Sequence, residues 1–118
     1  MPTLKPIVRG AGSVRADVVR LGPISFLGDL NPETGEISGV KVAGRILAVP
    51  YVRGSTVGPY VLWHAAAKGN APIAIVSRSV DLMLITAAVL ANVPLFQGDL
   101  PEDCVELDLS TGYYERCR

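Results

Sequence analysis

The chain has 118 residues, of which 49% are hydrophobic and 19% are charged, a composition typical of one globular domain with a single core. Eleven basic and eleven acidic residues cancel, so there is no net positive charge with which to collect nucleic acid or anionic lipid. No apolar run reaches the ~20 residues that cross a bilayer, and the first ten residues lack a signal peptide's apolar core, so we expect a cytoplasmic protein.

The first part of the chain predicts short strands separated by turns. Residues 1–12 are rich in Pro and Gly and are expected to form a loop or an edge strand. Residues 13–21 alternate apolar and polar side chains and contain three valines, as a half-buried strand does. Residues 24–27 suit a second short strand or a packed loop. Residues 31–36, Asn-Pro-Glu-Thr-Gly-Glu, predict a turn, because Pro presets φ and Gly accepts a positive φ.

The middle of the chain predicts two helices alternating with three strands. Residues 45–49 and 73–76 are nearly continuous apolar runs, which are typical of strands buried on both faces. A helix is predicted over residues 57–68, with Ser55 or Thr56 as its cap and Gly69 after its end. Two parallel strands joined by a helix form a right-handed crossover.

The remainder completes an α/β domain. A second helix is predicted from a cap at Ser79 or Asp81 to about Ala91, where Asn92 and Pro94 stop it. Three further short strands are predicted over residues 93–96, 104–109 and 113–116. The predicted fold class is therefore α/β, with β-rich ends around a central strand–helix–strand unit, in a single domain spanning residues 1–118.

The two cysteines, Cys104 and Cys117, are too few for a disulfide framework and lack metal-ligand spacing. In a reducing cytoplasm they are expected to be two ordinary thiols, with a bond between them as the alternative.

One segment suits the binding of an anion. Arg53, Gly54, Ser55 and Thr56 precede the predicted helix, and the free N–H groups at a helix start favour negative charge. The Arg53 guanidinium can grip a carboxylate or a phosphate with two hydrogen bonds, and Gly54 permits a close approach of the backbone. Taken alone, the pattern is also satisfied by simple capping of the helix.

Other polar residues do not complete a catalytic site. His64 lies nine residues after Ser55, or roughly 13 Å along a helix, which is too far for a general base. It is interpreted as a partly buried helix residue, and Tyr60 and Trp63 as packing residues. Two carboxylate pairs are interpreted as residues of solvated loops: Asp29 with Glu33, and Glu102 with Asp103. A charged face exposed to solvent is the interpretation for Arg15, Asp17 and Arg20.

Four segments of the chain are long enough to be compared with the motifs of a protein family: "LGPISFLGDLNPETGEI" (21–37), "VPYVRGSTVGPYVL" (49–62), "GNAPIAIV" (69–76) and "ANVPLF" (91–96). In this order they span most of the chain, and together they resemble the small-subunit, or swivelling-domain, family of the aconitase X group. This chain has Pro59 where the family shows a second small residue, and Asp29 where Gly is common. Pro59 removes one N–H group from the helix start.

The resemblance implies a swivelling β/β/α domain like the last domain of aconitase. It also implies a hydro-lyase subunit that dehydrates small hydroxy acids together with a large subunit, which holds a 4Fe-4S cluster, while this chain alone binds no metal. The family's proton acceptor is the serine of R-G-S, which is Ser55 here. Arg53, Gly54 and Thr56 are then the expected substrate-binding residues.

Two substrates fit the resemblance. Archaeal-type members resemble phosphomevalonate dehydratase, which converts (R)-5-phosphomevalonate to trans-anhydromevalonate 5-phosphate in a modified mevalonate (isoprenoid) pathway. Bacterial-type relatives act on cis-3-hydroxy-L-proline. We expect the first, because the chain is short and stands alone. A non-catalytic module that binds a small anion, and a purely structural docking subunit, are the alternatives outside catalysis.

Overall fold

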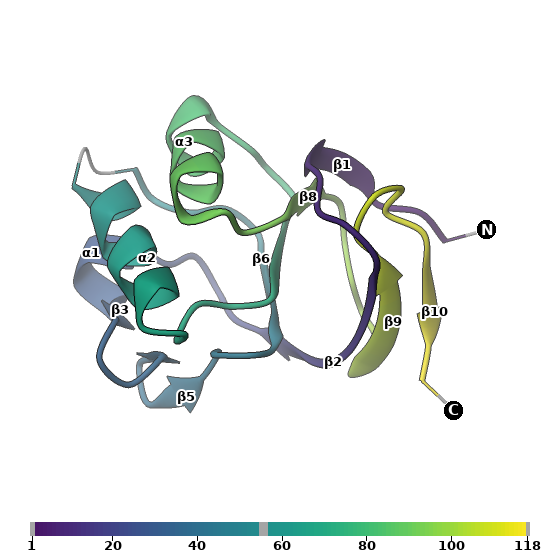
Figure 1. Ribbon diagram of the computed structural model, residues 1–118, viewed down its shortest axis with the longest axis horizontal. Helices are drawn as coiled ribbons and strands as arrows, with labels where there is room; N and C mark the ends of the chain where they lie inside the picture. Colours follow the sequence, from purple (N-terminus) through teal and green to yellow (C-terminus); the bar gives the residue numbers. More distant parts are fainter. Residues whose placement is uncertain (1, 55–56, 118) are drawn as a thin grey trace.

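The computed structural model describes residues 2–54 and 57–117 (Figure 1). Its helices are α1 (Phe26–Asp29), α2 (Gly58–Ala67) and α3 (Leu82–Ala91). Its strands are β1 (Lys5–Val8), β2 (Ser13–Arg20), β3 (Leu30–Asn31), β4 (Glu36–Ile37), β5 (Val40–Lys41), β6 (Ile46–Val49), β7 (Ala74–Ser77), β8 (Leu95–Gln97), β9 (Cys104–Asp108) and β10 (Tyr114–Arg116).

Seven strands form one sheet in the order β1-β8-β7-β6-β2-β9-β10. The four central strands run parallel, whereas β1 and the β9–β10 pair join the two sides antiparallel. The three helices lie on one side, away from β9 and β10 (Figure 1). Strands β3, β4 and β5 form a small separate sheet beside them. This arrangement confirms the predicted α/β class and the parallel strand–helix–strand unit.

Both faces of the central strands are buried, as the continuous apolar runs predict. On β6, Leu47 and Val49 face the helices and pack with Leu62 of α2 and Leu84 of α3. Ile46 and Ala48 belong to a second apolar cluster, on the opposite face, which contains residues of β8, β9 and β10. The helical layer is therefore fixed to a rigid sheet, which holds the loops at the strand ends in place.

The helix boundaries follow from local chemistry. The Asp81 side chain caps α3 by accepting a hydrogen bond from the Leu84 N–H at 2.9 Å. Asn92 (φ +57°) ends α3, and Gly69 (φ +74°) follows α2, both in the left-handed conformation. They confirm the predicted start and end of α3 and the predicted end of α2.

The predicted turn between Asn31 and Glu36 is also present and joins β3 to β4. Gly35 has φ +72°, and a Cβ added there would lie 2.6 Å from the Ala43 Cβ. Glycine is therefore required both by the backbone conformation and by the close approach of the next segment.

The expectation of a strand or a packed loop at residues 24–27 is right only at Ile24, which is buried and forms a β-bridge with Val52. A short helix, α1, begins at Phe26. The Asp29 N–H donates to the Ser25 carbonyl, and the Asp29 carboxylate accepts from the Ser25 N–H, each at 2.8 Å. This reciprocal pair closes one helical turn that the apolar pattern did not reveal.

The expectation of two free thiols is wrong as well. Cys104 and Cys117 form a disulfide. Strands β9 and β10 are antiparallel with Val105 opposite Arg116, so the two cysteines come next to each other at the strand ends. The Cys117 N–H donates to the Cys104 carbonyl at 3.0 Å, which fixes the same pairing in the backbone. Strand pairing thus brings the two thiols together.

Reduction of this disulfide is expected to lower the free energy of unfolding by about 3 kcal/mol, because the bond closes a loop in the unfolded chain. The separation of the two cysteines is 13 residues. Urea unfolding with and without a reductant measures the loss. The double variant Cys104→Ser/Cys117→Ser is the control, because it has no thiol left to respond. Equal midpoints for the wild type in both conditions would contradict the prediction.

Candidate functional site

The loops that follow β6 and β7 lie side by side at the carboxyl ends of the parallel strands. The Arg78 N–H donates to the Val49 carbonyl at 3.2 Å, and the Ser79 N–H donates to the Pro50 carbonyl at 3.0 Å. Residues that leave neighbouring parallel strands at such an edge converge, and this edge is where open α/β sheets bind ligands. The segment 53–56 predicted from the sequence follows directly on one of these loops.

Arg53 is held at this edge by both its backbone and its side chain. Its N–H donates to the Ile24 carbonyl at 2.7 Å. Its guanidinium Nη2 lies 3.5 Å from the Asp29 Oδ2, and the two side chains are 56% and 28% exposed. Because the same carboxylate accepts from the Ser25 N–H, Asp29 links Arg53 to α1. Asp29 is thus an orienting partner of the cation rather than a solvated loop residue.

Gly54 packs against the start of α3. A Cβ added there would lie 3.8 Å from the Met83 side chain and 4.0 Å from the Asp81 carboxylate. Gly54 therefore sits near the N-terminus of α3 and precedes that of α2. The Asp81 carboxylate already caps the start of α3, so the cation that this loop offers to a negatively charged ligand is the Arg53 guanidinium.

Ser55 and Thr56, predicted as proton acceptor and substrate-binding residue, lie outside the described residues, and so does the predicted capping by either hydroxyl. The described part of α2 has Val57 at the cap position, without a side-chain cap, and Pro59 in the first turn. Proline is suited to a first turn because its missing N–H would have no partner within the helix.

A notch of about 90 Å³ opens at the same edge of the sheet, between Arg20, Pro50, Arg78 and Gly98. Arg20 donates to the Glu102 carbonyl and pairs with Asp103, while the Arg78 Nε donates to Asp99 at 2.9 Å. The sequence pattern places Arg20 on a charged solvent face and does not distinguish Arg78. Their positions at the carboxyl ends of β2 and β7 are the signal that could have found them.

Both guanidiniums around this notch are hydrogen-bonded to carboxylates, whereas the Arg53 Nη2 lies 3.5 Å from the Asp29 Oδ2, so the notch is the weaker anion site. Burial, followed by the negative charges of Glu102 and Asp99, raises the pKa of the Tyr114 phenol. Asp103 offsets the charge of Arg20, and Asp99, which also perturbs Tyr114, offsets the charge of Arg78. We therefore place the candidate site at the loop after β6.

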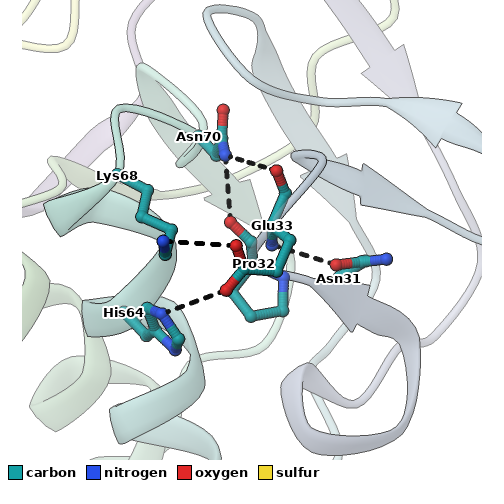
Figure 2. Close-up of polar contacts among 6 residues, drawn as sticks. All are labelled: Asn31, Pro32, Glu33, His64, Lys68 and Asn70. Atoms are coloured by element: carbon teal, nitrogen blue, oxygen red, sulfur yellow. Dashed lines mark hydrogen bonds and ion pairs between the residues drawn. The ribbon is translucent and has the colours of Figure 1, made fainter.

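A set of polar contacts holds the β3–β4 turn to the end of α2 (Figure 2). The two Glu33 carboxylate oxygens lie 3.4 Å from the His64 Nε2 and 3.2 Å from the Lys68 Nζ. The Asn70 side-chain amide donates to the Pro32 and Glu33 carbonyls, both at 3.0 Å. The His64 side chain is about half exposed, which agrees with its interpretation as a partly buried helix residue, and Glu33 has a structural partner.

Within this set, Asn70 is expected to matter more than Glu33. Asn70→Ala should cost about 1–2 kcal/mol, because two backbone carbonyls lose their donor in a partly buried place. Glu33→Gln removes an exposed ion pair that salt screens, so it should cost less than about 1 kcal/mol. Thermal unfolding of both variants at low and high salt tests this order. A larger loss for Glu33→Gln would refute it.

The part of the chain that the structure describes holds no group of three or more His, Cys, Asp or Glu residues placed to bind a metal ion. The disulfide also removes both thiols as ligands. These residues do not fit an iron–sulfur cluster. Among the described residues, no helix is long and apolar enough to cross a membrane.

The aconitase X swivel domain family matches residues 3–114. The chain belongs to this family. It is similar to the phosphomevalonate dehydratase small subunit of Methanopyrus kandleri, with 41% identity over 92% of this chain and 84% of the relative. The protein of that name from Archaeoglobus fulgidus is 37% identical over 94% of both chains.

Two solved structures have the same fold. Aconitase X of Thermococcus kodakaraensis in its holo form superposes with a TM-score of 0.85 and 30% identity, over 100% of both chains. A UPF0107 protein solved by solution NMR has a TM-score of 0.79 and 32% identity, over 98% of both chains. The predicted swivelling domain is confirmed by the family match and by these two likenesses.

Proposed function

We propose that this chain is the small subunit of a cytoplasmic hydro-lyase that dehydrates (R)-5-phosphomevalonate to trans-anhydromevalonate 5-phosphate in a modified mevalonate pathway. The observation that carries the proposal is the 41% identity to a phosphomevalonate dehydratase small subunit over 92% of the chain. The anion-favouring loop at Arg53 and Gly54 supports it, because the substrate carries both a carboxylate and a phosphate.

The proposed reaction removes a proton from the carbon next to the carboxylate and hydroxide from the adjacent carbon, so that a double bond forms between them. Because this chain's residues do not fit a cluster, we assign the 4Fe-4S cluster to the large subunit, where it supplies Lewis acidity for the loss of hydroxide. We assign to this chain the group that accepts the proton from the substrate carbon.

Ser55 is the proposed proton acceptor. A serine hydroxyl is a weak base in water, but a helix start and a nearby cation favour its alkoxide form. Arg53, oriented by Asp29 at 3.5 Å, provides that cation and a bidentate grip on the substrate carboxylate or phosphate. Gly54 and the proposed ligand Thr56 would offer backbone N–H groups to the same anion.

Reconstitution of the purified chain with its large subunit tests the substrate. We expect the complex to release the unsaturated phosphate ester from (R)-5-phosphomevalonate and to leave cis-3-hydroxy-L-proline unchanged. Turnover of hydroxyproline alone would instead assign the chain to the other dehydratase. A chain that binds phosphate or carboxylate ligands tightly while no complex turns over either substrate would be a non-catalytic binding module.

A further inference from the structure

Helices α2 and α3 are unusual for helices at a surface, because they carry almost no charge. Residues 58–67 and 82–91 contain no Asp, Glu, Lys or Arg, and their only ionisable side chains are Tyr60 and His64. A helix that covers a sheet normally presents a charged face to water, whereas a helix that is apolar all round is normally buried. The outer faces of α2 and α3 have the composition of an interface core, which is depleted of charge.

Large apolar side chains are exposed on these outer faces. We define the helical patch by five of them: Tyr60 (62% exposed), Trp63 (50%), Leu82 (77%), Val89 (61%) and Leu90 (43%). Together they expose on the order of 600 Å², the upper end of what a monomer normally presents and most of the ~800 Å² that one partner contributes to a stable interface. The interpretation of Tyr60 and Trp63 as packing residues is therefore wrong for this chain by itself.

The patch is hollowed as well as apolar. A groove of about 360 Å³ runs between the two helices and is lined by Pro59, Tyr60, Leu82, Met83, Thr86 and Leu90. A groove of this size and chemistry accepts an aliphatic or aromatic side chain from another surface, in the way that anchor residues fill pockets at interfaces.

The patch begins at the candidate site. Tyr60 and Leu82 lie in the first turns of α2 and α3, and Met83, which lines the groove, is the residue that Gly54 packs against. Both helices lie on the side of the sheet away from β9 and β10 (Figure 1). A protein that places reactive groups next to Arg53 and Gly54 would therefore also contact the helical patch.

We infer that the helical patch is the surface on which the large subunit docks, an inference that rests on the proposed function. A second copy of this chain is the less suitable occupant, because it would cover the approach to Gly54 and exclude the partner. The complementary surface of the large subunit is expected to be apolar and uncharged, with a side chain that enters the groove between α2 and α3.

Charge substitutions in the patch test this inference. Leu82→Asp and Tyr60→Asp place a carboxylate in the first turn of a helix, where the dipole favours it, so the fold should persist. Val40→Asp, on β5 and outside the patch, is the matched control, since Val40 is 38% exposed. Circular dichroism checks folding, calorimetric titration with the purified large subunit gives Kd, and light scattering gives the mass of the chain alone.

We expect Leu82→Asp/Tyr60→Asp to raise Kd on the order of 100-fold and Val40→Asp to change it less than about twofold. Folded patch variants that bind the large subunit as tightly as the wild type would overturn this inference and leave the proposed function standing. A wild-type chain that binds no large subunit would overturn both. A dimer of this chain that Leu82→Asp dissociates, with binding of the large subunit unchanged, would assign the patch to a second copy.

Discussion

Ser55→Ala is expected to lower kcat of the assembled dehydratase by about 10³-fold, because it removes the proposed proton acceptor from the reacting carbon. Binding of the large subunit should not change, since a hydroxyl that acts on the substrate contributes little to the protein interface. Steady-state rates and a binding titration on the same samples separate the two effects.

The control for this substitution is Ser13→Ala. Ser13 is an exposed serine at the start of β2 and is distant in the sequence from the site. It should leave both kcat and Kd unchanged. If Ser55→Ala turns over as fast as Ser13→Ala in a fully formed complex, Ser55 is not the base, and another group must take the proton.

Arg53→Ala is expected to lower kcat/KM by about 100-fold, because the substrate loses a charge-assisted, bidentate hydrogen-bonded contact. Arg53→Lys should recover only part of the loss, since an ammonium cannot reproduce the fork of the guanidinium. Asp29→Asn keeps the guanidinium but removes the charge that orients it at 3.5 Å, so a smaller loss is expected. Steady-state measurements of kcat/KM for the wild type and the three variants, at low and at high salt, test this order.

Arg9→Ala is the matched control for Arg53→Ala, because Arg9 is an exposed arginine that lies next to β1 and not in the loop after β6. It removes the same net charge from the surface. Equal kinetic losses for the two variants would mean that the total charge of the chain matters and that the position of Arg53 does not.

The parts of the fold that the sequence predicts well are those decided by local patterns. The apolar runs of β6 and β7, the cap at Asp81 and the left-handed residue Asn92 each act within a few residues, so the central strand–helix–strand unit could be predicted. The turn at Gly35 is equally local, because its proline and glycine fix the backbone conformation.

Apart from the short helix α1, most of the failures concern partners that are distant in the sequence. The disulfide depends on the pairing of β9 with β10, and the role of Asp29 depends on Arg53, more than twenty residues away. The notch between Arg20 and Arg78 forms only once β2, β6 and β7 lie side by side. None of these proximities can be read from a window of neighbouring residues.

Tyr60 and Trp63 are a different kind of failure. Apolar side chains on a helix that covers a sheet are expected to be buried, and burial within this chain is satisfied by Leu62 and Ala65 instead. The two aromatic residues remain exposed because the helix has more apolar surface than one face can cover. Under the inferred docking, the pattern indicates burial against another polypeptide, which no window of this sequence identifies.

The most direct test of the shared active site is a titration of the purified large subunit with this chain at saturating (R)-5-phosphomevalonate. Neither protein alone should release product, and the rate should rise with added chain until it reaches a plateau. The same titration with Ser55→Ala should saturate at the same concentration of added chain, but the plateau rate should be about a thousandth of the wild-type rate. A large subunit that is fully active before any of this chain is added would contradict the account.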